Sequence, residues 1–300
     1  MRVLITGSNG LLGGYLVKDL IAAGYKVLAT SRGENRTISR NLLDSSLVEY
    51  QSADITDGIA ILSLITAFQP DLIIHAAALT QVDYCELHPV ECWNTNVTAT
   101  RFIIEAAKKV NAALLYVSTD FVFSGEKGMY DESDETGPVN YYGSSKRAAE
   151  KAVMDAGVAW SIARTVLVYG NAIGPSRSHM LTWVRNELMK GNTIKVVNDQ
   201  IRTPTYAGDL SAGIVKMVNQ RAGGVFHLSG KDILTPYEMA VQTARYLSLD
   251  ADMILKVDAG SFSQPAKRPP KTGFNIEKAE KQLGYNPISF REGLEKVFSS

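Results

Sequence analysis

A short apolar run followed at once by a glycine-rich turn opens the chain and restricts its fold more than any other feature. Residues 2–6 (RVLIT) predict a buried strand, and residues 7–13 (GSNGLLG) form the turn. Apolar residues then keep helical spacing up to Gly24, a natural helix end, and residues 25–30 predict a second strand. A βαβ unit of this length makes a parallel sheet with right-handed crossovers the default.

The same alternation continues through the first half of the chain. The further predicted strands are residues 47–51, 72–76, 113–118 and 160–168. The predicted helices between them are residues 57–68, 89–111 and 141–156. This order predicts an α/β fold, namely a Rossmann-type doubly wound parallel sheet with helices on both faces.

After residue 170 the alternation loosens, and Gly, Pro and Asn become common. Residues 207–219 and 225–228 predict a return to the sheet, whereas residues 236–247 and 275–283 predict helices elsewhere. We therefore expect two parts, each assembled from separated segments. They are an NAD(P)-binding Rossmann domain of residues 1–168 and 207–230, and a smaller C-terminal substrate-binding lobe of residues 169–206 and 231–300.

Charge and composition exclude several classes of partner. Lys plus Arg and Asp plus Glu both number 31, so nothing indicates bulk attraction to nucleic acid or to a membrane surface. No apolar run approaches the length of a membrane span. With no targeting segment after Met1 and few cysteines, a cytoplasmic protein is expected.

The two cysteines, Cys85 and Cys92, are seven residues apart with His88 between them. This spacing puts both thiols on one helical face, which raises the question of a metal site. No second ligand pair follows, so we expect two half-buried thiols and no metal.

The glycine turn predicts a dinucleotide site, because glycines let the backbone approach a pyrophosphate and a helix N-terminus favours its charge. A purely structural tight turn is the alternative. Cofactor choice depends on the end of the second strand, where an acid binds the ribose of NAD and an Arg accommodates the phosphate of NADP. Residues 29–32 read ATSR, without an acid. NADP(H) is therefore favoured through Arg32, and NAD(H) remains the alternative, with Arg32 as a solvated loop residue.

Tyr142 and Lys146 lie four residues apart in a predicted helix and so share one face. A nearby ammonium would lower the pKa of the phenol and fit it for proton transfer. Taken alone, the pair is better explained as a surface Tyr and a solvated Lys on one helical face. Thr119, however, follows a central strand and places a hydroxyl at the edge of the sheet where ligands of such folds bind.

The glycine turn, the hydroxyl of Thr119 and the Tyr-x-x-x-Lys pair together resemble short-chain dehydrogenases of the extended type. The resemblance implies that Thr119 bonds the substrate oxygen, Tyr142 moves the proton, and Lys146 lowers the tyrosine pKa and holds the nicotinamide ribose. The cofactor-binding residues that it implies are Gly7, Asn9, Gly10, Leu11, Leu12, Gly13, Arg32, Asp54, Ile55, Ala76, Ala77, Ala78, Asn96, Tyr142 and Lys146.

Four segments narrow the resemblance to the dTDP-4-dehydrorhamnose reductase family. They are residues 76–83 (AAALTQVD), 118–125 (STDFVFSG), 142–146 (YGSSK) and 199–205 (DQIRTPT). The family implies NADPH-dependent reduction of the keto group of a nucleotide-linked 6-deoxysugar, dTDP-4-dehydro-L-rhamnose to dTDP-L-rhamnose. The sequence predicts no metal-binding residues and leaves a metal requirement open. The substrate residues that it implies are Thr80, Val82, Asp83, Gln200 and Thr205.

Two departures keep alternatives open. The family carries a Trp after an Arg-Thr pair, whereas Val166 and Leu167 follow Arg164-Thr165 here, so an epimerase or reductase of another nucleotide sugar stays open. Residues 225–230 (VFHLSG), 235–240 (TPYEMA) and 267–270 (KRPP) also resemble the regulatory β subunit of methionine adenosyltransferase. A non-catalytic NADP-binding subunit is therefore the second hypothesis. The wider superfamily often dimerises, which leaves a homodimer open, although the sequence shows no interface signature.

Overall fold

A seven-stranded parallel sheet forms the centre of the computed structural model, which describes residues 1–39, 43, 46–171 and 180–299. In spatial order the strands are β10 (Gly224–His227), β6 (Trp160–Thr165), β5 (Ala113–Thr119), β4 (Leu72–His75), β1 (Arg2–Thr6), β2 (Lys26–Ser31) and β3 (Val48–Ser52). The strand order reverses between β4 and β1, and ligands of open α/β sheets bind at such a point. The predicted doubly wound α/β fold is confirmed.

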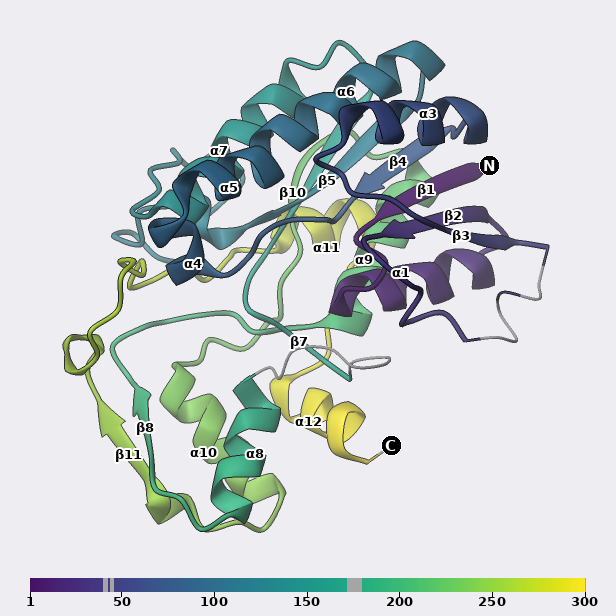
Figure 1. Cartoon of the computed structure of the whole chain (residues 1–300). Helices are drawn as coiled ribbons and strands as arrows, with labels where there is room; N and C mark the ends of the chain where they lie inside the picture. The colour runs from purple at the N-terminus through teal and green to yellow at the C-terminus, as the bar shows by residue number, and fades with distance from the viewer. Residues whose placement is uncertain (40–42, 44–45, 172–179, 300) are drawn as a thin grey trace.

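Helices cover both faces of this sheet (Figure 1). One face carries α3 (Gly58–Phe68), α6 (Ala99–Val110) and α7 (Tyr141–Met154), and the other carries α1 (Leu11–Ala22), α9 (Ala207–Gln220) and α11 (Glu277–Leu283). Along β1, Leu4 packs into the core of the first face, while Val3 and Ile5 pack into the core of the second. This alternation is expected of a strand that is buried on both sides.

The helix predicted over residues 89–111 is built from three successive pieces. They are α5 (Pro89–Trp93), a π-helical turn (Asn94–Thr98) and α6, which ends at Asn111 in a left-handed conformation. Single π-helical turns inside α-helices are frequent at functional sites. A short helix that the sequence does not predict, α4 (Val82–Leu87), precedes α5.

The predicted strand 160–168 is interrupted after Thr165. Leu167 has a φ of 36°, a left-handed backbone conformation that cannot continue a strand. The chain resumes as β7 (Val168–Tyr169), which pairs with β9 (Thr205–Tyr206) outside the central sheet.

A smaller group of elements lies beside the sheet, at the lower part of Figure 1. It consists of α8 (Met180–Met189), β8 (Ile194–Val197), α10 (Pro236–Tyr246), β11 (Ile254–Val257) and α12 (Phe290–Phe298). Strands β8 and β11 form a parallel pair, and their Ile194 and Ile254 pack with Val184 of α8 and Ala240 of α10 in a separate core. None of the helices that the structure describes is long and apolar enough to cross a bilayer.

Helix α11 packs on the side of the central sheet, whereas the sequence prediction places its residues in the substrate-binding lobe. The sequence assigns residues 231–300 to the substrate lobe, but α11 packs against α9 and β10. Its Ala279 and Leu283 belong to the same buried core as Ile214 and Phe226. The helix covers apolar surface that β10, at the edge of the sheet, would otherwise expose.

Candidate active site

A cavity of about 770 Å³ lies where the carboxyl ends of the central strands meet the smaller lobe. Sequence-predicted residues that line it are Gly7, Gly10, Leu11, Leu12, Gly13, Arg32, Asp54, Ile55, Ala76, Ala77, Ala78, Thr80, Val82, Thr119, Tyr142, Lys146 and Gln200. Residues far apart in the chain therefore share one site, and its size lies within the range of small-molecule pockets.

The glycine turn has the close backbone contacts that a phosphate cradle needs. A side chain at Gly13 would place its Cβ atom 2.3 Å from the carbonyl oxygen of Gly7, so only glycine fits there. Gly10 precedes α1 without a side-chain cap, which leaves the first-turn amides of that helix available. The turn thus fits a pyrophosphate group of a dinucleotide.

The segment after β2 forms the far end of the cavity. Arg32 is largely exposed, and its guanidinium lies 4.0 Å from the carboxylate of Asp54. Burial raises the pKa of Asp54, but hydrogen bonds from Thr56 and the charge of Arg32 outweigh burial, so the pKa lies below its usual value. Arg32 is free to turn toward an anionic ligand, because an ion pair this long and exposed is weak.

Thr119 ends β5 and presents its hydroxyl at the other end of the cavity. Its Oγ1 accepts a hydrogen bond from the Phe121 amide at 3.3 Å and donates to Asp120 Oδ1 at 2.9 Å. Asp120 also accepts a hydrogen bond from the hydroxyl of Thr272, and burial raises the pKa of this carboxyl. The hydroxyl of Thr119 therefore sits in a polar network that reaches the C-terminal segment.

Helix α7 carries Tyr142 and Lys146 against the end of β5. Asn140 caps the helix by accepting a hydrogen bond from the Gly143 amide at 2.8 Å. A Cβ atom at Gly143 would lie 2.1 Å from the Phe121 carbonyl oxygen, so glycine is required for this close approach. The result is that Tyr142, Lys146 and Thr119 face the same cavity.

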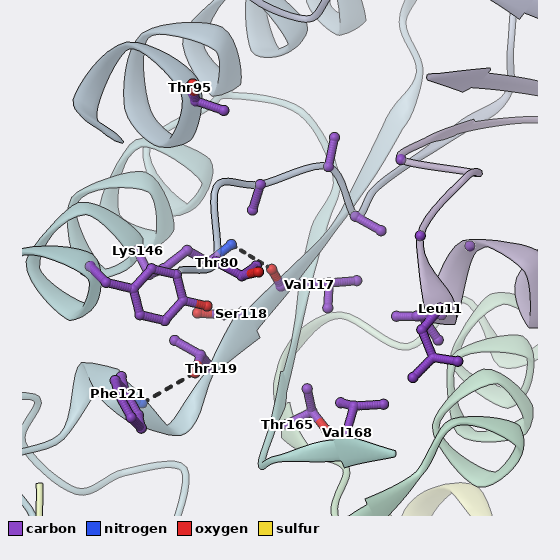
Figure 2. A pocket seen from close by; sticks show the side chains of 18 of the residues that line it. Leu11, Thr80, Thr95, Val117, Ser118, Thr119, Phe121, Lys146, Thr165 and Val168 are labelled. Atoms are coloured by element: carbon purple, nitrogen blue, oxygen red, sulfur yellow. Dashed lines mark hydrogen bonds between the residues drawn. The ribbon is translucent and has the colours of Figure 1, made fainter. Parts of the chain in front are cut away.

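The predicted effect of Lys146 on the acidity of Tyr142 is wrong for this structure. The Lys146 ammonium donates to the Val117 carbonyl at 2.8 Å (Figure 2). It also lies 4.0 Å from the centre of the Tyr116 ring. Burial raises the pKa of Tyr142 above its ordinary value and lowers the pKa of Lys146 to about 7. Burial disfavours both charged forms, so the phenol keeps its proton at neutral pH.

Two predicted cofactor residues form hydrogen bonds with nearby backbone groups and do not line the cavity. The Asn9 amide donates to the Glu34 carbonyl at 2.9 Å, and its oxygen accepts from the Arg36 amide at 2.9 Å. Asn9 thus fixes the loop that carries Arg32. Asn96, in the π-helical turn, bonds both backbone groups of Leu79 at 2.8 and 3.0 Å. It thereby holds the segment that follows β4.

Two predicted substrate residues are also directed elsewhere. Both oxygens of Asp83 accept hydrogen bonds from Arg268, at 2.5 and 2.6 Å, and the guanidinium of Arg268 lines the cavity instead. The hydroxyl of Thr205 is buried and donates to the Val166 carbonyl at 2.6 Å. Each side chain is satisfied by protein groups that are distant in sequence.

The structure brings further residues to the cavity that the sequence-based site omits. They include Ser31, Thr95, Val117, Ser118, Asp120, Thr165, Leu167, Val168, Arg202 and Arg268. Of these residues, Thr165 could have been found from strand pairing. It lies on β6, beside Thr119 of β5, and the two are register partners. A hydroxyl at the end of one central strand thus has a counterpart at the end of the next.

The two thiols are more deeply buried than predicted. Cys85 and Cys92 are both inaccessible to solvent and pack with Tyr142 in a small cluster. The Cys92 thiol contacts Ser145 Oγ at 3.5 Å, and the Asn96 amide contacts the same sulfur at 3.5 Å. Within the described part of the chain, no group of three or more His, Cys, Asp or Glu side chains is arranged to hold a metal.

Comparison with known proteins gives full-length similarity. The family model described as "RmlD substrate binding domain" matches residues 1–300. A probable low-salt glycan biosynthesis reductase, Agl14 of Haloferax volcanii, is 30% identical over 305 residues, which cover 100% of this chain and 99% of that protein. The crystal structure of dTDP-4-dehydrorhamnose reductase from Bacillus anthracis in complex with NADP is 30% identical, has a TM-score of 0.85, and covers 99% of this chain and 98% of its own.

A relative with a different name is similar over nearly the same length. Methionine adenosyltransferase 2 subunit beta of Mus musculus is 29% identical over 303 residues, which cover 98% of this chain and 86% of that protein. Both resemblances stated from the sequence motifs are thus matched by full-length relatives.

Proposed function

Because the chain belongs to the RmlD substrate-binding-domain family, we propose that it is an NADPH-dependent reductase of a nucleotide-linked 6-deoxysugar, with dTDP-4-dehydro-L-rhamnose as the first candidate substrate. One observation carries the proposal. Thr119, Tyr142 and Lys146 line the same cavity as the glycine turn, so a bound dinucleotide can reach the proton donor.

In the proposed reaction, Tyr142 and Lys146 have different roles. When bound, NADPH would supply the hydride for the keto carbon. Tyr142 gives its proton to the resulting alkoxide oxygen, and the raised pKa of its phenol keeps that proton in place until the oxygen becomes basic. The negative charge that remains on Tyr142 favours the protonated form of Lys146. Solvent then restores the proton on Tyr142.

Thr119 orients the carbonyl in this scheme. In the structure its hydroxyl proton points to Asp120, but a hydroxyl rotates freely about its C–O bond. It can turn to the substrate oxygen, because Asp120 still accepts a hydrogen bond from Thr272. Arg202 and Arg268, which line the cavity from the C-terminal half of the chain, are suited to the diphosphate of a nucleotide sugar.

The proposed reaction is tested by mixing the purified protein with NADPH and a panel of nucleotide-linked keto-sugars. We expect NADPH oxidation with a 4-keto-6-deoxysugar, and a product that has gained two hydrogens by mass spectrometry. The panel should vary the sugar and the nucleotide separately. The resembling family carries a Trp after the Arg-Thr pair, whereas Val166 and Leu167 follow it here, and Leu167 lines the cavity.

The second candidate is a non-catalytic NADP-binding subunit, favoured by the similarity to methionine adenosyltransferase 2 subunit beta. In that case, no keto-sugar of the panel would cause NADPH oxidation, although the protein would still bind NADPH. Stable complex formation with a catalytic protein would then support the regulatory role.

Replacing Arg32 with alanine is expected to weaken NADPH binding more than NADH binding. The guanidinium lines the cavity next to Ser31 and Asp54 and is only loosely paired, so it is available for the 2′-phosphate that NADPH alone carries. Titration calorimetry with both cofactors measures the difference. Arg101→Ala removes an exposed arginine of α6 that does not line the cavity and is the matched control. Equal losses for NADPH and NADH in Arg32→Ala would remove Arg32 from cofactor selection.

A further inference from the structure

His75 ends β4 and is buried, and both of its ring nitrogens have hydrogen-bond partners although the residue does not line the cavity. Nδ1 lies 2.8 Å from the hydroxyl of Thr6, which ends β1 directly before the glycine turn. Nε2 lies 3.0 Å from the hydroxyl of Thr100 in α6. A buried polar group whose partners are all present makes its surroundings rigid, so the ring ties β1 to α6.

The neighbouring groups fix the direction of each of these hydrogen bonds. Thr100 donates its only hydroxyl proton to the Asn96 carbonyl at 2.7 Å, so its oxygen accepts the proton of His75 Nε2. Burial lowers the pKa of His75 to about 3, so the ring is neutral at neutral pH and its Nδ1 carries no proton. Nδ1 therefore accepts from the hydroxyl of Thr6, whose oxygen accepts from the Ala77 amide at 3.3 Å. These bonds hold His75 in one tautomer.

Asn96 extends the hydrogen bonds to the helix of the proton donor. Its side-chain amide donates to Ser145 Oγ at 2.9 Å, and Ser145 Oγ donates to the Tyr142 carbonyl at 2.7 Å. Asn96 lies in the π-helical turn, which packs against α7, and both Asn96 and Ser145 are buried. A continuous series of hydrogen bonds therefore runs from the residue before the glycine turn to the first turn of α7. We call its side chains the His75 network: Thr6, His75, Thr100, Asn96 and Ser145.

The His75 network connects two parts of the cavity wall without lining the cavity itself. At its ends are Gly7, which follows Thr6, and Tyr142, and both of these residues line the cavity. A misplacement of reacting groups by about 1 Å can lower turnover about a hundredfold. The separation of the glycine turn from the proton donor is therefore a quantity that the network can control.

We propose that His75 is a positioning residue, which sets the distance between the glycine turn and Tyr142 through the His75 network. This inference rests on the proposed reduction, in which a dinucleotide held by the turn and the proton of Tyr142 act on one substrate. It gives a function to a buried polar residue that the reaction itself does not use.

Thr100→Val tests the network without changing His75 or the cavity lining. Valine keeps the shape of threonine and removes the hydroxyl that joins His75 to Asn96. We expect turnover with the accepted keto-sugar to fall about tenfold to a hundredfold, because the proton donor is misplaced. The dissociation constant of NADPH, measured by titration calorimetry, should stay close to that of the wild type. Thr100→Ser keeps a hydroxyl and should restore most of the turnover.

Thr243→Val is the matched control for the loss of a buried hydroxyl. Thr243 lies in α10, and its hydroxyl donates to the carbonyl four residues earlier, that of Met239, at 2.7 Å. Thr100 donates to Asn96 with the same spacing and the same distance. Thr243 does not line the cavity, so its replacement should change neither turnover nor NADPH affinity. Urea unfolding of both variants shows whether they lose similar stability.

Two substitutions of His75 itself separate its two hydrogen bonds. Glutamine places an amide near the position of Nε2 and can still donate to Thr100, whereas asparagine places its amide near Nδ1 and can meet only Thr6. We expect His75→Gln to keep more turnover than His75→Asn. Adding Thr100→Val to His75→Asn should lower turnover no further, because both changes break the same link.

Nitrogen NMR of the wild-type protein, labelled with ¹⁵N-histidine, checks the bond directions without using activity. We expect the ring proton of His75 on Nε2, and its signal among the four histidines is the one that His75→Gln removes. A ring proton on Nδ1 would contradict the bond directions and the inference.

The possible failures point to different errors. Wild-type turnover in Thr100→Val, or an equal loss of turnover in Thr243→Val, would show that the network only supports the fold, and the inference would be wrong. A Thr100→Val variant that loses as much NADPH affinity as turnover would contradict it too, because the network would then act on cofactor binding. A wild-type protein that oxidises no NADPH with any keto-sugar of the panel would overturn the proposed function and, with it, this inference.

Discussion

Replacing Tyr142 with phenylalanine is expected to lower turnover by about 10²–10⁴-fold, the usual contribution of a positioned proton donor. The phenol is the donor that the proposed reduction needs, and its raised pKa keeps it protonated at neutral pH. Phenylalanine retains the ring that packs edge-on against Phe121, with the two ring centres 5.9 Å apart. NADPH binding should therefore be largely kept. Steady-state kinetics with the accepted keto-sugar and an NADPH titration measure the two quantities.

The adjacent tyrosine provides a matched control. Tyr141 begins the same helix and packs against Trp93, with ring centres 6.4 Å apart, but it does not line the cavity. Tyr141→Phe should leave turnover close to that of the wild type. Near wild-type turnover in Tyr142→Phe would show that another group supplies the proton.

Removing one partner of the buried ion pair between Glu150 and Arg164 is expected to cost about 3–5 kcal/mol of folding stability. The guanidinium bonds both carboxylate oxygens, at 2.9 and 2.8 Å, and both side chains are almost fully buried. Glu150→Leu leaves the Arg164 charge buried without its counter-charge. Because Arg164 also lies over the Phe123 ring, 5.0 Å from its centre, it cannot move readily to solvent.

Urea unfolding of the single and double variants tests this prediction. Glu150→Leu combined with Arg164→Met removes both charges and should recover much of the stability that Glu150→Leu loses. The exposed pair of Glu277 and Lys281 is the control, and Glu277→Gln should leave the unfolding midpoint nearly unchanged, since exposed pairs contribute little. A Glu150→Leu variant as stable as the wild type would mean that the ion pair does not hold α7 to β6.

The predicted site residues that the structure brings to the cavity come from short contiguous motifs. The strand, glycine turn and helix of residues 2–22 are local patterns, and so is the four-residue spacing that puts Tyr142 and Lys146 on one helical face. Thr119 was found because the end of a predicted central strand fixes where its side chain can be. Each of these inferences needs only the periodicity of one or two elements.

Predictions about single polar side chains were less successful, and the reason is physical. A buried polar side chain bonds the groups that the folded chain places within hydrogen-bond distance, and these are often distant in sequence. Asn96 bonds Leu79, 17 residues away, and Thr205 bonds Val166, 39 residues away. Asp83 is paired with Arg268 across 185 residues, so the arginine faces the cavity in place of the acid. Residue type alone did not reveal these competing partners.

The sequence by itself determined the sheet, the glycine turn and the helical spacing of Tyr142 and Lys146, because hydrophobic period and turn chemistry act within a few residues. Only the tertiary structure decided which polar groups line the cavity, that burial raises the pKa of Tyr142, and that α11 packs against α9 and β10. Those outcomes depend on desolvation and on hydrogen-bonding partners that folding brings together. Neither can be inferred from the local sequence pattern.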